Sequence, residues 1–115
     1  MDDLQALRSE LDRFVAERDW DQFHTPKNLA MALIAEAAEL LEHFQWLTPE
    51  QSCDLPPHSR AEVELEIADV LLFLLRLCDK LNIDPLQAAH KKLELNALKY
   101  PVDKARGRAT KYDKL

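Results

Sequence analysis

Two segments of the sequence are apolar on nearly every face of a helix and yet carry acidic residues. Residues 29–41 read Leu-Ala-Met-Ala-Leu-Ile-Ala-Glu-Ala-Ala-Glu-Leu-Leu, and residues 66–75 read Glu-Ile-Ala-Asp-Val-Leu-Leu-Phe-Leu-Leu. Helices that are apolar all round belong in the centre of a structure. Each segment therefore places two acidic residues where an unpaired charge is unfavourable.

The remainder of the sequence also favours helices. Gly107 is the only glycine, whereas strand-rich folds need glycine at turns and bulges. We predict an all-α fold resembling a four-helix bundle. The 115 residues are enough for one domain. Residues 101–115 are expected to form an extended basic tail of that domain.

Apolar periodicity and capping residues predict four long helices. They are expected at residues 2–18, 26–46, 59–81 and 85–100, with a short helical turn after Pro49. Thr25 and Asp84 each precede a proline, which is typical of an N-cap followed by the first helical residue. Ser59 and Glu62 have the spacing of a capping box and predict the start of the third long helix.

The acidic residues form two pairs at helical spacing. Glu36 and Glu39 are three residues apart, as are Glu66 and Asp69, so each pair lies on one face of its helix. Side-by-side packing of the two helices would bring all four carboxylates together. Ionised carboxylates in an apolar pocket repel one another, and without a cation some are expected to stay protonated. An all-oxygen ligand set suits Mg²⁺ or Mn²⁺.

Three other interpretations compete with a catalytic metal site. Most paired acids on helices belong to a solvated face, but these have apolar neighbours in place of lysine or arginine. A di-iron carboxylate bundle needs Glu-x-x-His pairs, and the residues three positions before His43 and His90 are Leu40 and Gln87. A non-catalytic helical assembly module would explain the apolar helices, but it would leave the acids inside them unexplained.

The charge and cysteine content restrict the partners. A net charge of −6 argues against binding a nucleic acid polymer, although a bound divalent metal would still allow a small anionic substrate. Cys53 and Cys78 form no metal-binding motif and suit a reducing compartment. There is no signal-peptide pattern, and the longest apolar stretch, residues 29–35, is too short to span a membrane. We expect a cytoplasmic protein without membrane contact.

The acid motifs and several longer stretches resemble a known family. The ExxE motif followed by ExxD resembles the all-α nucleotide pyrophosphatase superfamily, the MazG-like proteins. Other stretches are similar to its branch of eukaryotic deoxycytidine triphosphate pyrophosphatases. These stretches are residues 14–28, 44–46, 66–70, 96–102 and 106–112.

The resemblance implies an activity and an assembly. It implies that the protein cleaves a dNTP between the α and β phosphates, giving a nucleoside monophosphate and pyrophosphate. The implied substrate is dCTP or a modified pyrimidine nucleotide, and the implied role is to cleanse the nucleotide pool. Mg²⁺ is held by Glu36, Glu39, Glu66 and Asp69, which are also the catalytic residues. A homo-oligomer, tetramer or dimer, builds its sites from more than one subunit.

The resemblance also implies contacts to the base. Trp20 and Trp46 resemble aromatic residues that contact the base, where stacking contributes ~1–3 kcal/mol each; the alternative is that both only fill the core. His24 is expected to contact the substrate or to orient its loop. Leu11 and Phe73 depart from the animal enzymes, which carry a histidine and a tyrosine near the base. An apolar slot discriminates between bases less than a polar one.

The phosphate contacts are expected from the C-terminal part of the chain. By resemblance, Lys92 and Asn96 point toward the metal and phosphates from one face of the last long helix. Arg106, Lys111 and Tyr112 in the tail are expected to close over them. The alternative for the lysines is an ordinary solvated charge.

Overall fold

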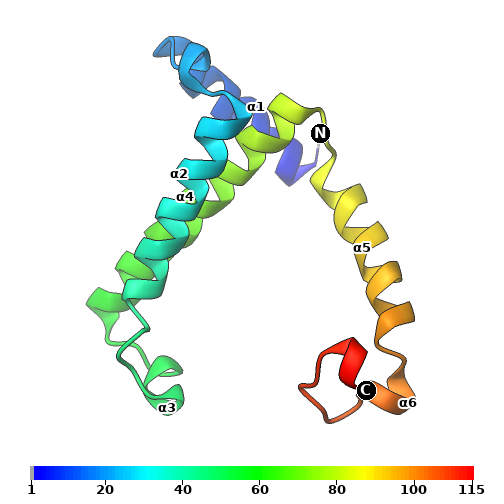
Figure 1. The fold of residues 1–115 in the computed structure, drawn as a ribbon. Helices are drawn as coiled ribbons and strands as arrows, with labels where there is room; N and C mark the ends of the chain where they lie inside the picture. The colour runs from blue at the N-terminus through cyan, green and yellow to red at the C-terminus, as the bar shows by residue number, and fades with distance from the viewer. Residues whose placement is uncertain (1) are drawn as a thin grey trace. The chain divides into compact units, whose positions relative to one another are not determined.

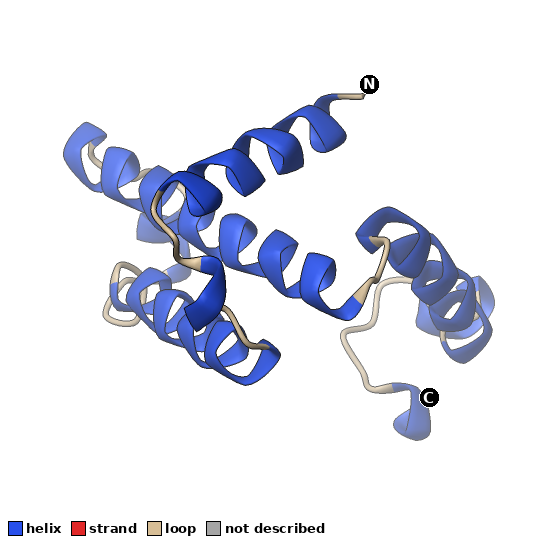
Figure 2. Cartoon of the chain, turned by 90° about the horizontal axis from the view of Figure 1, so that it is seen from above, coloured by secondary structure: helices blue, strands red, loops and turns tan. Residues whose placement is uncertain are grey.

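The structure, a computed structural model, describes residues 2–115, which form helices and loops without a strand (Figures 1 and 2). The chain divides into two compact units, the first ending at Asn82 and the second comprising Ile83–Leu115. The first unit contains α1 (Asp3–Glu17), the 3-10 helix η1 (Asp21–Phe23), α2 (Pro26–Glu42), α3 (Pro49–Ser52) and α4 (Pro57–Leu81). The second contains α5 (Pro85–Lys99), α6 (Val102–Ala105) and the 3-10 helix η2 (Tyr112–Lys114).

Helices α2 and α4 are the centre of the first unit. They run antiparallel and side by side along most of the length of α2, and α1 also contacts α4 (Figure 1). The buried apolar side chains of the described residues come from all three helices. They are Val15 of α1, Leu29 of α2, and Val63, Leu75 and Cys78 of α4.

Many apolar side chains of α2 and α4 remain uncovered within one chain. Ile34 and Leu65 are each 68% exposed, and Met31, Leu41 and Ile67 are also exposed. The two apolar helices therefore lie against each other as expected, but each keeps a second apolar face that no part of the first unit buries. Contiguous exposed apolar surface of this kind is typical of protein interfaces.

The helix starts follow the capping residues, with one correction. The side chain of Thr25 accepts from the backbone N–H of Asn28, and Asp84 caps α5 in the same way. The predicted capping box at Ser59 is wrong, because α4 already begins at Pro57 and has no side-chain cap. Proline fits the first helical position without the loss of a hydrogen bond. A capping box exists instead at α3, between Thr48 and Gln51.

Two other boundaries differ from the predictions. Helix α2 ends at Glu42 and is followed by turns, so it stops one turn before Trp46. The tail is only partly extended, because it contains α6 and η2. Among residues 2–115, no helix has both the length and the apolar character needed to cross a bilayer.

We predict that Leu29→Ala lowers the free energy of unfolding by about 2–5 kcal/mol, since Leu29 is 1% exposed and its loss leaves a cavity between helices. Lys27→Ala, an exposed change in the same helix, serves as the control and should alter stability by less than about 0.5 kcal/mol. Urea unfolding measures both. Equal effects would show that the interior position contributes no more than the surface.

Candidate active site

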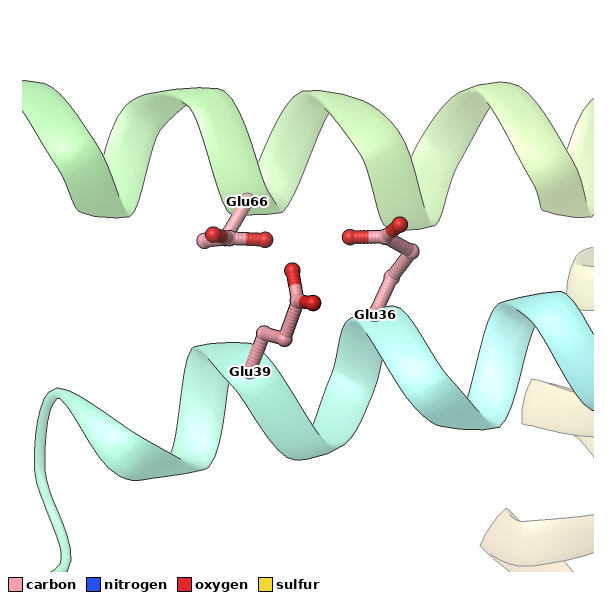
Figure 3. A group of neighbouring side chains, drawn as sticks. All are labelled: Glu36, Glu39 and Glu66. Carbon is pink, nitrogen blue, oxygen red and sulfur yellow. The ribbon is translucent and has the colours of Figure 1, made fainter.

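The acid pairs of α2 and α4 meet between the two helices. Glu36 and Glu39 project from α2 toward α4, and Glu66 projects from α4 into the same space (Figure 3). One carboxylate oxygen from each lies within 4.8 Å of the others. Because residues three apart share a helix face, the antiparallel packing of α2 and α4 is enough to create this cluster.

The cluster is electrostatically strained without a counter-charge. Oε2 of Glu36 and Oε2 of Glu66 are buried and have no hydrogen-bond partner among the described residues. Burial, followed by the hydrogen bond and charge of Glu39, raises the pKa of Glu36 to about 7. Burial and the same neighbour also raise the pKa of Glu66. The carboxyl of Glu36 therefore keeps its proton to a higher pH than an ordinary glutamate does.

Asp69 lies at the edge of this cluster. It is outside the group of three converging oxygens, yet after burial and Glu39 its charge is a further cause of the raised pKa of both Glu36 and Glu66. In the described part of the chain, no lysine or arginine forms an ion pair with any of the four carboxylates.

The donor set fits a hard divalent cation. Mg²⁺ and Mn²⁺ prefer oxygen ligands, and the cluster offers carboxylate oxygens alone. The two buried oxygens that lack a donor are acceptors that a cation would satisfy. Glu36, Glu39 and Glu66 therefore form a group that could hold such a cation, and the charge of Asp69 acts on two of its members, Glu36 and Glu66.

An apolar cavity of about 340 Å³ adjoins the acid motif through Asp69. Its wall is mostly apolar and aromatic side chains from α1, α4 and the loop between α1 and α2, namely Leu11, Phe14, Val15, Trp20, Leu72 and Phe73. Its polar lining is His24, Asp69 and Arg76. The rings of Phe14 and Trp20 meet edge to face at 5.7 Å. A largely apolar cavity with a few polar groups is typical of a small-molecule site.

Of the residues expected near the base, Trp20, His24 and Phe73 line this cavity together with Leu11. Trp46 does not line it and is 86% exposed, beyond the end of α2. The two tryptophans, both expected near the base, therefore have different surroundings in the structure.

The expected phosphate contacts all belong to the second unit, so their part in the site stays a prediction. They are Lys92, Asn96, Arg106, Lys111 and Tyr112. Within that unit, the ring of Tyr112 packs edge to face on Tyr100 at 6.0 Å, and Lys99 Nζ lies 4.8 Å from its centroid. Gly107 has φ 73°, a conformation that glycine adopts readily. The tail thus folds back on the end of α5.

Arg76 is the residue of this region that the sequence analysis missed. It is only 6% exposed, and its guanidinium donates to His24 Nδ1 at 3.2 Å, Asp12 Oδ1 at 3.1 Å and Asp21 Oδ1 at 2.7 Å. Lys80 Nζ also lies 2.7 Å from Asp21 Oδ1. An arginine inside an apolar helix, two turns after the acidic motif, was a signal that could have revealed it.

Known proteins are similar to this chain in sequence and in fold. Residues 32–115 match the model of the MazG-like family. The chain is 41% identical to dCTP pyrophosphatase 1 of Mus musculus, over all of this chain and 67% of the mouse protein, and 38% identical to that of Homo sapiens with the same coverage. A solved pyrophosphatase structure from Archaeoglobus fulgidus is 43% identical, with a TM-score of 0.83 over 88% of this chain and 94% of that one. The expected all-helical fold is confirmed.

We predict that the metal-free protein loses stability as the pH rises from about 4.5 toward about 7. In this window the folded state keeps the proton of Glu36 while the unfolded chain has released it, so folding binds a proton and higher pH opposes it. Urea unfolding in a chelator, compared with Glu36→Gln, isolates this carboxyl from other titrating groups. Glu64→Gln, an exposed change on α4, should keep the wild-type slope. A wild-type slope in Glu36→Gln would contradict the raised pKa.

We also predict that Mg²⁺ or Mn²⁺ raises the melting temperature more above pH 7 than below it, because a cation binds deprotonated carboxylates. At a hundredfold excess over its Kd, a metal stabilises by about 2.7 kcal/mol. Differential scanning calorimetry measures the shift. Glu66→Gln should remove most of it and Glu64→Gln should not. Equal shifts in these two variants would place the metal elsewhere.

Proposed function

Because the chain belongs to the MazG-like family, we propose that it is a nucleoside triphosphate pyrophosphohydrolase that cleaves a dNTP between the α and β phosphates. The products are a nucleoside monophosphate and pyrophosphate. The observation that carries this proposal is the carboxylate cluster of Glu36, Glu39 and Glu66, which adjoins an apolar cavity through Asp69. The proposed setting is the nucleotide pool of the cytoplasm.

The four carboxylates are assigned to a divalent cation, Mg²⁺ or alternatively Mn²⁺. When bound, such a cation offsets the charge of the phosphates and lowers the pKa of a water molecule. Glu36 and Glu66 are the partly buried members of the cluster and Glu39 is the exposed one. We therefore assign Glu39, the exposed member, the further role of accepting the proton of the attacking water.

The cavity is assigned to the base of the substrate. Trp20 and Phe73 offer aromatic faces on which a base can stack. Because Asp69 also lines the cavity, the phosphates of a base held there would lie near the acid cluster. The substrate we propose is a pyrimidine dNTP, either dCTP or a modified form. The names of the mouse and human relatives support dCTP, whereas the apolar Leu11 and Phe73 favour less discrimination between pyrimidines.

The second unit is assigned to the phosphates. Lys92 and Asn96 lie one turn apart on α5, and the tail carries Arg106, Lys111 and Tyr112. The cationic side chains among them suit the triphosphate, because they offset its negative charge in a chain whose net charge is −6.

A homo-oligomer, dimer or tetramer, would complete the fold. The uncovered apolar faces of α2 and α4 fit a second copy, and two such pairs would form a four-helix bundle. Trp46, exposed in one chain, would then be available to a base held by a neighbouring subunit. A non-catalytic assembly module would use the same apolar faces, but it would have no use for the carboxylates between them.

We predict that the protein with Mg²⁺ releases pyrophosphate from dNTPs and that Glu39→Ala lowers kcat by at least about a hundredfold, the usual range for losing a general base. A coupled pyrophosphate assay over a panel of nucleotides measures it. Glu64→Gln, at an exposed position of α4 where the wild-type carboxylate pairs with Arg60, should keep the wild-type rate. An unchanged rate in Glu39→Ala would end the catalytic assignment.

We predict that nucleotide binding quenches the fluorescence of Trp20. The Trp46→Phe variant should retain this quenching, because Trp20 lines the cavity while Trp46 does not. The Trp20→Phe variant should lose the part of the quenching that comes from the cavity. Titration with dCTP and a metal provides the measurement, and quenching that depends on Trp46 alone would relocate the base.

A further inference from the structure

Arg76 has no part in the proposed chemistry, yet it is the buried cation among the described residues of the first unit. Removing a guanidinium from water is unfavourable unless it is paired and hydrogen-bonded. Its partners come from α1, from η1 and from the loop before α2, through Asp12, Asp21 and His24. One side chain of α4 therefore fixes the loop that carries both Trp20 and His24 into the cavity.

The hydrogen bond between Arg76 and His24 determines where the imidazole carries its proton. A guanidinium has donors and no acceptor, so His24 Nδ1 must accept at 3.2 Å from Arg76 Nε. An accepting Nδ1 has no proton, and a neutral ring then carries its proton on Nε2. Burial lowers the pKa of His24, and the charge of Arg76 lowers it further. The second ring nitrogen is therefore an N–H donor.

The surroundings of the His24 Nε2–H donor make it selective for a base that carries a hydrogen-bond acceptor. His24 lines a cavity whose wall is otherwise mostly apolar, and the other polar lining groups are Asp69, at the metal end, and Arg76 itself. A buried donor left without an acceptor loses its hydrogen bonds to water, which costs about as much as a hydrogen bond contributes. A base that fills the cavity should therefore present a carbonyl oxygen or an unprotonated ring nitrogen at this edge.

We propose that Arg76 is a positioning residue for base selection, which holds His24 in the Nε2–H tautomer so that it donates to an acceptor on the buried edge of the base. This inference rests on the proposed function and makes it more specific. The ligand class is a nucleobase with a hydrogen-bond acceptor at that edge. A base of the same shape without acceptors is rejected.

The matched ligands for a test are dTTP and the triphosphate of its difluorotoluene isostere, which keeps the shape of thymine and lacks its carbonyl oxygens. In the wild type, kcat/KM should favour dTTP by about 10- to 100-fold. In His24→Phe, which keeps an aromatic ring, the ratio should fall to about threefold or less, with most of the change in KM for dTTP. Hydrolysis of the isostere should change little.

Arg76→Lys tests the positioning role. Lysine keeps the positive charge near Asp12 and Asp21 but lacks the fork that reaches His24 through Nε. The discrimination should fall here as well. The ¹⁵N shifts of the His24 ring should show an unprotonated Nδ1 in the wild type and a mixture of tautomers in the variant. Lys80→Gln removes the other cation paired with Asp21 but keeps the hydrogen bond from Arg76 to His24, so it should leave both the ratio and the tautomer unchanged.

The two ways of failing can be told apart. If no dNTP releases pyrophosphate, the proposed function is wrong, and the role in base selection is lost with it. If dNTPs are hydrolysed but the ratio survives in His24→Phe, the proposed function stands and the inference about Arg76 is overturned. A wild-type His24 protonated at Nδ1 overturns it equally, and this ring measurement does not depend on turnover.

Discussion

Repulsion among carboxylates between two apolar helices is the constraint from which the rest of this structure follows. Helices α2 and α4 pack side by side, and that packing brings Glu36, Glu39 and Glu66 within reach of one another. Two of the buried oxygens have no donor among the described residues. Such an arrangement opposes folding in the absence of a proton or a cation. A function for the cluster would explain this unfavourable arrangement. The function that its chemistry fits is to bind a metal ion that in turn binds a triphosphate.

The first unit also contains a buried positive charge, the guanidinium of Arg76, whose surroundings differ from those of the carboxylates. Arg76 is more deeply buried than the acids, but its charge is compensated within the chain by Asp12 and Asp21, and it also donates a hydrogen bond to His24. The carboxylate cluster is left for an external cation, while the arginine is fully engaged in holding the loop between α1 and α2. The apolar cavity is lined by both Asp69 and Arg76. At the Asp69 end the carboxylates lack a counter-charge, whereas at the Arg76 end the charged group is already hydrogen-bonded within the chain.

Much of the fold was predictable because its determinants are local. The caps at Thr25 and Asp84 and the helical spacing of the acid pairs are readable within a few residues of sequence. The failure at Ser59 is also local, because two competing start signals lay side by side and Pro57 prevailed. The Arg76 network was not predictable, since its partners are 52 to 64 residues away in the chain. The different exposure of Trp20 and Trp46 depends on tertiary packing, which helical periodicity does not encode.

The uncovered apolar faces of α2 and α4 have a consequence for how much of this protein a cell must make. If the proposed homo-oligomer forms on these faces, it would supply stability that one chain lacks, because so few of the described side chains are buried within it, and that contribution would follow mass action. Folding and assembly then share one free energy, and dilution weakens both together. The enzyme would act only above a threshold abundance, below which its subunits would be open to proteolysis.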